Sequence, residues 1–160
     1  MEEKGSLVQE LEALFPGKLR PAPDLSRDDV FNVERDFLPE CAARLKQEPF
    51  DYTMLLDLTC VDYLAGEGCL EMVYTFFSLV RRRRLRLKAR LPQDDLRIGS
   101  LAVLWKNADW LEREVFDLFG VRFEGHPDLR RILLYEGFEG HPLRKSYPLR
   151  RRQPRQVSRK

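Results

Sequence analysis

The most regular alternation of polar and apolar residues in this chain lies between residues 84 and 91. Four apolar positions alternate with four cationic ones, namely Leu85, Leu87, Ala89 and Leu91 with Arg84, Arg86, Lys88 and Arg90. Successive side chains of a β-strand point to opposite faces, so this pattern predicts a strand with one buried and one cationic face. Residues 70–80 are apolar on both parities, which predicts a central strand covered on both faces. The two strands should pair antiparallel through a tight turn near 81–83.

Other segments predict helices and further strands around this hairpin. An amphipathic helix over 5–15 would bury Leu7, Val8, Leu11, Leu14 and Phe15. Asp36 would cap a second helix, ending near Pro49, that buries Cys41, Ala42 and Leu45. Strands are expected at 30–34, 52–60 and 121–124, a loop at 92–99, and a helical turn from Ser100 to Trp105.

This order of elements predicts an α+β fold. We expect two layers, a mixed β-sheet with helices packed on it, followed by an extended C-terminal segment. Residues 1–149 would form a single domain. Residues 150–160 are a basic tail without core-forming aromatic residues, and such a segment is expected to be disordered on its own.

A helix of about three turns is predicted from Trp110 to Gly120. Asp109 is a favourable N-cap, and Glu112 three residues later completes a capping-box pattern. Gly120 can adopt the left-handed conformation that ends a helix. The sequence therefore bounds this helix at both ends.

The predicted helix is apolar nearly all round, with only Arg113 and Asp117 in a clearly polar sector. This pattern is typical of a helix that is buried on more than one side. Glu112 and Glu114 fall between apolar residues, and carboxylates removed from water need partners. An arginine of the same chain could supply them, or part of the helix could be covered by another subunit. The sequence leaves both alternatives open.

Two similar motifs follow, fifteen positions apart. Residues 125–131 read GHPDLRR and residues 140–145 read GHPLRK, and they contain both histidines of the chain, His126 and His141. Glycine permits a left-handed turn, and proline forces the preceding histidine into an extended conformation. Each motif predicts a rigid corner that presents an imidazole followed by paired cations, which are Arg130 and Arg131 in the first and Arg144 and Lys145 in the second.

Residues 112–133, EREVFDLFGVRFEGHPDLRRIL, and 140–149, GHPLRKSYPL, resemble the signature of the 30-kDa subunit family of respiratory complex I. In bacteria this family is part of NADH-quinone oxidoreductase. Residues 50–63, FDYTMLLDLTCVDY, and 100–105, SLAVLW, are also similar to family segments, so the resemblance extends over residues 26–149. Ser146 departs from the acidic residue that is more usual in the family at that corner.

The resemblance implies a non-redox structural subunit in the hydrophilic arm of a proton-translocating NADH:quinone oxidoreductase, peripheral to the cell membrane on its cytoplasmic side. It implies the 49-kDa-type subunit and iron–sulfur subunits as partners. FMN and the iron–sulfur clusters would lie in partner subunits and no cofactor in this chain, which would have no activity alone. The alternative is the equivalent subunit of a related membrane-bound hydrogenase or deazaflavin-linked dehydrogenase complex.

We expect residues 109–149 to bind partner subunits rather than to perform chemistry. The candidate partner-binding residues are Glu112, Arg113, Glu114, Asp117, His126, Arg130, Arg131, His141, Arg144 and Lys145. The acids would meet cations of a partner and the arginines and lysine its carboxylates, while the histidines would fix the two corners through hydrogen bonds. For each residue, the alternative is stabilisation of the chain's own fold.

Charge is distributed unevenly along the chain. Residues 1–80 carry 7 Lys or Arg against 16 Asp or Glu, whereas residues 81–160 carry 21 against 10. The basic strand and tail make a nucleic-acid-binding module the rival hypothesis. The strand lacks the interleaved aromatic side chains on which bases stack. Arginine, which outnumbers lysine by 21 to 7, equally suits bidentate pairing with carboxylates at a protein interface.

Catalytic and metal-binding patterns are not recognisable in the sequence. There is no G-x-G-x-x-G or G-x-x-x-x-G-K-[ST] loop and no nucleophile in a recognisable elbow. Cys41, Cys60 and Cys69 lack C-x-x-C spacing and are expected to be buried, reduced thiols. No apolar run approaches the ~18 residues needed to cross a bilayer, and the acidic start MEEK is unlike a signal peptide.

Overall fold

The structure of the 160-residue chain is a computed structural model that describes residues 3–22, 28–150 and 152–153. The helices are α1 (Glu3–Leu14), α2 (Leu38–Lys46), α3 (Leu64–Glu67) and α4 (Ala108–Phe119), with a 3-10 turn, η1 (Arg35–Phe37), directly before α2. The strands are β1 (Leu19–Pro21), β2 (Asp29–Val33), β3 (Met54–Asp62), β4 (Cys69–Ser78), β5 (Arg83–Pro92), β6 (Arg97–Gly99) and β7 (Arg122–Glu124).

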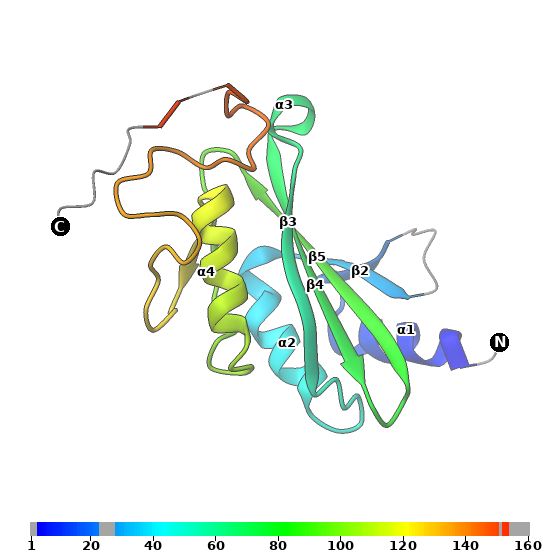
Figure 1. Ribbon diagram of the computed structural model, residues 1–160. Helices are drawn as coiled ribbons and strands as arrows, with labels where there is room; N and C mark the ends of the chain where they lie inside the picture. The colour runs from blue at the N-terminus through cyan, green and yellow to red at the C-terminus, as the bar shows by residue number, and fades with distance from the viewer. Residues whose placement is uncertain (1–2, 23–27, 151, 154–160) are drawn as a thin grey trace.

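Five strands form one mixed sheet in the order β1-β2-β5-β4-β3 (Figure 1). The β2–β5 pair is parallel and the other pairs are antiparallel. The predicted hairpin is confirmed, because β4 and β5 pair along their whole length from Cys69↔Pro92 to Ser78↔Arg83. The mixed sheet and helices confirm the α+β prediction.

The burial of the strands matches the sequence pattern on one face only. Leu85, Leu87, Ala89 and Leu91 of β5 have no exposed surface, as their alternation predicts. In β4, however, Val73, Thr75 and Phe77 are only half-buried, so the expected covering of both faces is wrong. The strand predicted at 52–60 is confirmed as β3. The sequence also predicted that this strand is buried, which is wrong, because β3 is an edge strand and alternates between buried and exposed residues.

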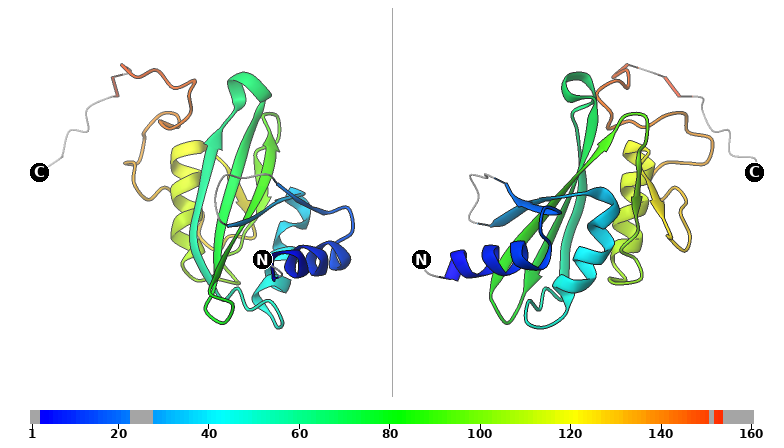
Figure 2. Two further views of the ribbon diagram at one scale, coloured as in Figure 1. Left: turned by 90° about the vertical axis from the view of Figure 1, so that its right-hand side faces the viewer. Right: turned by 180° about the vertical axis from the view of Figure 1, so that it is seen from behind.

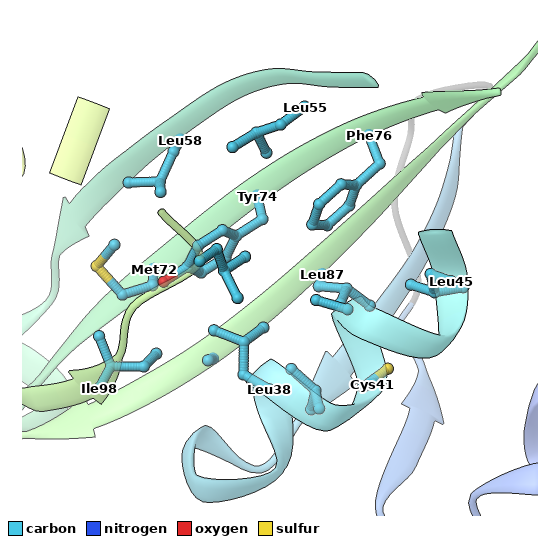
Figure 3. Packing of buried hydrophobic residues seen from close by; sticks show 14 of the residues in the cluster. Leu38, Cys41, Leu45, Leu55, Leu58, Met72, Tyr74, Phe76, Leu87 and Ile98 are labelled. Carbon is cyan, nitrogen blue, oxygen red and sulfur yellow. The ribbon is translucent and has the colours of Figure 1, made fainter. Parts of the chain in front are cut away.

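Helices α2 and α4 line the buried face of the sheet (Figures 1 and 2). Leu38, Cys41, Ala42 and Leu45 of α2 are fully buried, and Figure 3 shows Leu38, Cys41 and Leu45 near Leu87 of β5. Helix α4 packs along β3. These contacts leave the C-terminal part of the chain to cover the outer side of α4.

Some predicted helix ends differ from the structure. Asp36 does not cap α2, because it lies inside η1 and Phe37 occupies the N-cap position. Leu14 of α1 is 46% exposed instead of buried, whereas Leu11 and Phe15 are in the core. The side chains of Leu7 and Val8 lie outside the described part. Phe15 reaches Phe37 edge to face, with 5.1 Å between ring centroids.

The segment 92–99, predicted as a loop, contains strand β6, which pairs in parallel with β7. A three-residue strand with a single buried residue, Ile98, leaves no alternation to recognise. Residues 79–80, predicted as strand, instead form the turn before β5. Around Ser100 the prediction is closer, since its hydroxyl accepts the Ala102 N–H (3.1 Å) at the start of the turn to Trp105.

All three cysteines are free and buried, as predicted. Burial raises the pKa of Cys41 and of Cys60 to about 12, so neither thiol is reactive at neutral pH. Of the predicted basic tail, only Arg150, Arg152 and Gln153 belong to the described residues. Within the described ranges, no helix combines the length and hydropathy that a bilayer crossing requires.

Candidate functional site

Helix α4 begins at Ala108, and Asn107 occupies its N-cap position, so the prediction that Asp109 caps this helix is wrong. The amide of Asn107 donates to the carbonyl of Leu55 (2.8 Å) and does not cap the helix. The indole of Trp105 donates to the carbonyl of Thr53 (2.9 Å). These two bonds attach the residues just before α4 to residues 53–55, where β3 begins.

Glu112 is completely buried inside the chain. One carboxylate oxygen accepts the backbone N–H of Leu101 (2.6 Å), and the other accepts the hydroxyl of Ser100 (2.6 Å). The predicted capping box is therefore absent. The hydrogen-bond partners of Glu112 belong to its own chain, and neither is an arginine. Burial raises the pKa of Glu112 from 4.5 to about 7, because its two hydrogen bonds offset only part of the desolvation.

The first histidine corner closes over the start of α4. The Nδ1 atom of His126 accepts the N–H of Asp128 (3.0 Å), so in the neutral ring the proton lies on Nε2. Nε2 then donates toward the carbonyl of Asp109 (3.2 Å) and lies 4.0 Å from a carboxylate oxygen of Glu112. The His126 side chain has no exposed surface, and its imidazole points inward.

Asp117 binds the chain that follows this corner. One of its oxygens accepts the N–H groups of Ile132 (3.1 Å), Leu133 (2.9 Å) and Leu134 (2.8 Å), and the other accepts Arg131 (2.7 Å). Burial would raise the pKa of Asp117, but these donors outweigh it and hold the pKa below its ordinary value. The predicted polar sector is thus wrong at Asp117, which is fully buried.

The second histidine corner covers the end of α4. The last carbonyl groups of a helix have no partner within it and must find one elsewhere. Here the carbonyls of Asp117, Leu118 and Phe119 accept, respectively, Nδ1 of His141 (3.0 Å), the N–H of Leu143 (3.2 Å) and Nε of Arg144 (2.6 Å). The two corners therefore hold opposite ends of the same helix.

Gly120 makes this closure possible. Its φ of +78° is left-handed, as predicted for the residue that ends the helix. A Cβ atom at this position would lie 2.5 Å from Nε2 of His141 and 2.6 Å from Nη2 of Arg144. Burial lowers the pKa of His141 and so favours the neutral ring, whose Nδ1 lies 3.0 Å from the carbonyl oxygen of Asp117.

Further bonds fix the segment between and beyond the corners. Arg113 donates to the carbonyls of Arg130 (3.2 Å) and Arg131 (3.4 Å). Asp62, a residue that the sequence analysis missed, accepts the N–H of Lys145 (2.7 Å) and that of Leu64 (2.8 Å). A carboxylate at the end of an apolar strand was the available signal. Residues 125–149, which we call the signature segment, are thus attached to α4 and to the end of β3.

The ten candidate residues divide into two groups. Seven have internal partners in the contacts above, namely Glu112, Arg113, Asp117, His126, Arg131, His141 and Arg144. The expectation that Glu112 and Asp117 meet cations of a partner is therefore corrected. Three are exposed, namely Glu114, Lys145 and Arg130, and Arg130 makes a surface ion pair with Asp128 (2.8 Å). The seven residues point inward because a segment without helix or strand has no regular backbone pairing, and here side chains supply its hydrogen-bond partners.

The polar side chains of this region form hydrogen bonds within the chain. Both imidazoles have one nitrogen on a backbone carbonyl, and Asp117 accepts four donors. Among the described residues, no group of three or more His, Cys, Asp or Glu could hold a metal ion. The hydrogen bonds of this region therefore hold residues 125–149 firmly against α4.

Known proteins share both sequence and fold with this chain. The family described as "Respiratory-chain NADH dehydrogenase, 30 Kd subunit" matches residues 31–153. An NADH-quinone oxidoreductase subunit of Trichlorobacter lovleyi is 43% identical over 150 residues, covering 93% of this chain and 92% of that protein. The subunit of the same name from Geobacter sulfurreducens is 40% identical with the same coverage.

Solved structures extend the comparison to three dimensions. The trypsin-resistant fragment (1-134) of Nqo5 has a TM-score of 0.67 at 29% identity, over 81% of this chain and all of the fragment. A chain of the membrane-bound sulfane sulfur reductase, an archaeal respiratory membrane complex, has a TM-score of 0.78 at 24% identity, over 92% of this chain and 86% of that one. The second likeness concerns the fold alone.

Replacing Gly120 by alanine should destabilise the chain more than the same change at Gly125. Both glycines have a left-handed φ (+78° and +81°), but a Cβ at Gly125 would meet nothing within 4 Å. The Gly120→Ala variant must also displace His141 and Arg144, which adds about 1–3 kcal/mol. Urea unfolding of both variants measures the difference. Equal losses of stability would show that the close contact of His141 and Arg144 with Gly120 does not contribute to the free energy of unfolding.

Glu112 should make the free energy of unfolding fall as pH rises from 4.5 to 7. The folded chain keeps this proton up to pH about 7 and the unfolded chain releases it near 4.5, so folding takes up a proton between these values. The loss amounts to about 3 kcal/mol. Urea titrations across this range should show the slope in the natural chain and in Glu114→Gln, an exposed control. The fall should be absent in Glu112→Gln, where the lowered pKa of His141 leaves at most a rise, and a persistent fall there would contradict the assignment.

Proposed function

Because this chain belongs to the respiratory-chain NADH dehydrogenase 30-kDa subunit family, we propose that it is a non-redox structural subunit of an NADH-quinone oxidoreductase. In this proposal the signature segment braces the quinone-reducing subunits while electrons pass from NADH through FMN and iron–sulfur clusters to quinone. Those cofactors lie in the partner subunits. The chain acts in the hydrophilic arm, peripheral to the cell membrane on the cytoplasmic side.

One observation carries the proposal: the signature segment is bonded internally on one side and exposes apolar and cationic residues on the other. Leu133, Leu143 and Leu149 are 61%, 52% and 103% exposed, and Arg130 and Lys145 of the same segment are exposed as well. Apolar side chains and arginines together are typical of protein interfaces. A segment held rigid before binding loses little entropy when a partner covers it.

The partners of this surface are expected to be the 49-kDa-type subunit and the iron–sulfur subunits. Their contacting surface should carry carboxylates opposite Arg130 and Lys145. The alternative is the equivalent subunit of a related hydrogenase-like or deazaflavin-linked complex. A surface of this kind would bind a partner there through the same apolar and ionic contacts, so the exposed residues do not distinguish the electron donor.

The nucleic-acid alternative loses support from the pairing of the cationic strand. Arg86 of β5 pairs with Asp28 (2.8 Å) and Arg90 pairs with Glu67 (2.8 Å). Arg83 pairs with Asp29 (3.2 Å). Cations that neutralise carboxylates of their own chain attract phosphates less strongly. The ion pairs therefore weaken the case for a nucleic acid on this strand.

Reversing the charges of Arg130 and Lys145 should abolish assembly without unfolding the chain. Both residues are exposed, and their backbones make the bonds to Arg113 and Asp62. Their side chains contact the chain only weakly, since Arg130 makes an exposed ion pair with Asp128 (2.8 Å) and Nζ of Lys145 lies 5.9 Å from the ring centroid of Tyr63. The Arg130→Glu/Lys145→Glu variant should therefore keep its melting temperature within about 2 °C. It should fail to co-purify with the 49-kDa-type subunit when the tagged chain is isolated from cells that contain the complex.

The matched control is Arg122→Glu/Lys106→Glu, which reverses one exposed arginine and one exposed lysine outside the signature segment. This control should co-purify normally. Retention of the 49-kDa-type subunit by the Arg130/Lys145 variant, at an unchanged melting temperature, would overturn the proposed docking surface.

A further inference from the structure

The tip of the β4–β5 hairpin is a second exposed surface that the signature segment does not include. Its turn begins with Leu79 and Val80, which are 63% and 76% exposed. The next four residues, 81–84, are all arginine. In Figures 1 and 2 this tip lies at the opposite end of the sheet from residues 135–149.

Two of the four arginines fix the base of the tip. The guanidinium of Arg81 donates twice to the carbonyl of Pro49 (3.1 and 2.7 Å) and lies 5.7 Å from the ring centroid of Phe50. Arg83 pairs with the buried carboxylate of Asp29 at 3.2 Å. The hydroxyl of Ser78 accepts the N–H of Arg81 (3.1 Å) and closes the turn. The tip is therefore attached to the loop after α2 and to β2.

The other two arginines extend outward. Arg82 and Arg84 are exposed, and Arg82 has a φ of +50°, a left-handed conformation that is uncommon for a residue with a side chain. Such a conformation persists only where the surroundings determine it. The tip therefore exposes two aliphatic residues and two arginines within six successive positions, on a turn that is attached at its base.

We propose that residues 79–84 are a second docking surface, which fits an apolar depression rimmed by carboxylates on a neighbouring protein subunit. Burial of Leu79 and Val80 would supply the hydrophobic contact. Arg82 and Arg84 would each pair with a carboxylate through two parallel N–H bonds, a geometry that lysine cannot provide. The inference takes from the proposed function only that the chain is part of an assembly.

A protein partner fits these residues better than an anionic membrane surface. The tip contains no tryptophan, tyrosine or phenylalanine, the residues that anchor proteins at the membrane–water boundary. Two aliphatic side chains bind a bilayer weakly, whereas in a shaped pocket the same side chains can be fully desolvated. Together with the signature segment, the tip would let the chain contact neighbours at two separated points.

Photo-cross-linking in the native complex tests this inference. A benzophenone amino acid replaces Val80 in one tagged full-length chain and Leu133 of the signature segment in another, and cross-linked peptides are identified by mass spectrometry. The chain carrying the probe at Val80 should join a protein subunit at a peptide rich in Asp and Glu. The added change Arg82→Glu/Arg84→Glu should lower this yield at least about tenfold. Arg122→Glu should leave it unchanged.

Two results would overturn the inference. One is cross-linking from Leu133 but none to protein from Val80, which would leave the proposed function standing. The other is that the purified chain binds phosphatidylglycerol vesicles and that Leu79→Ser/Val80→Ser abolishes this binding, which would identify a lipid contact instead. If neither probe joins a protein, the proposed function and the inference both fail.

Discussion

The carbonyl groups at the end of α4 and the polar groups of the signature segment satisfy one another. The last carbonyl groups of a helix that is covered by another part of the chain cannot hydrogen-bond to water. A segment without helix or strand lacks regular backbone hydrogen bonds of its own. His141 and Arg144 donate to the carbonyl groups at the end of α4, and Asp117 accepts three successive backbone N–H groups of the signature segment. The folded core and its extended covering are therefore one unit.

This interdependence explains why Arg131, Arg144 and both histidines of the signature segment point inward. Arg131 binds Asp117 and also reaches the carbonyl of Gly140 (3.4 Å), so it ties the first corner to the second. Aromatic contacts between Phe138 and two tyrosines, Tyr135 and Tyr147, stiffen the loop between them. Charge in the sequence signals the need for a partner but does not say whether that partner belongs to the same chain. What remains for other subunits is a rigid outer surface with few free cations.

The sequence predicted those parts of the fold that depend on local pattern. The alternation at 84–91 identified β5 and its pairing with β4, and Gly120 identified the end of α4. Features that depend on distant contacts could not be predicted in this way. Asp109 has the chemistry of an N-cap, but bonds from Trp105 and Asn107 to β3 start the helix earlier. The inward roles of the candidate residues likewise became visible only in three dimensions.

Amide hydrogen exchange at Ile132, Leu133 and Leu134 in the isolated full-length chain tests the central claim most directly. These three N–H groups bond only to the carboxylate of Asp117 in a segment without regular secondary structure. If α4 holds the segment in place before any partner binds, the three amides exchange far more slowly than those of an unstructured peptide. Exchange at the unstructured rate, while the amides of β4 remain protected, would contradict a docking surface that is formed in advance.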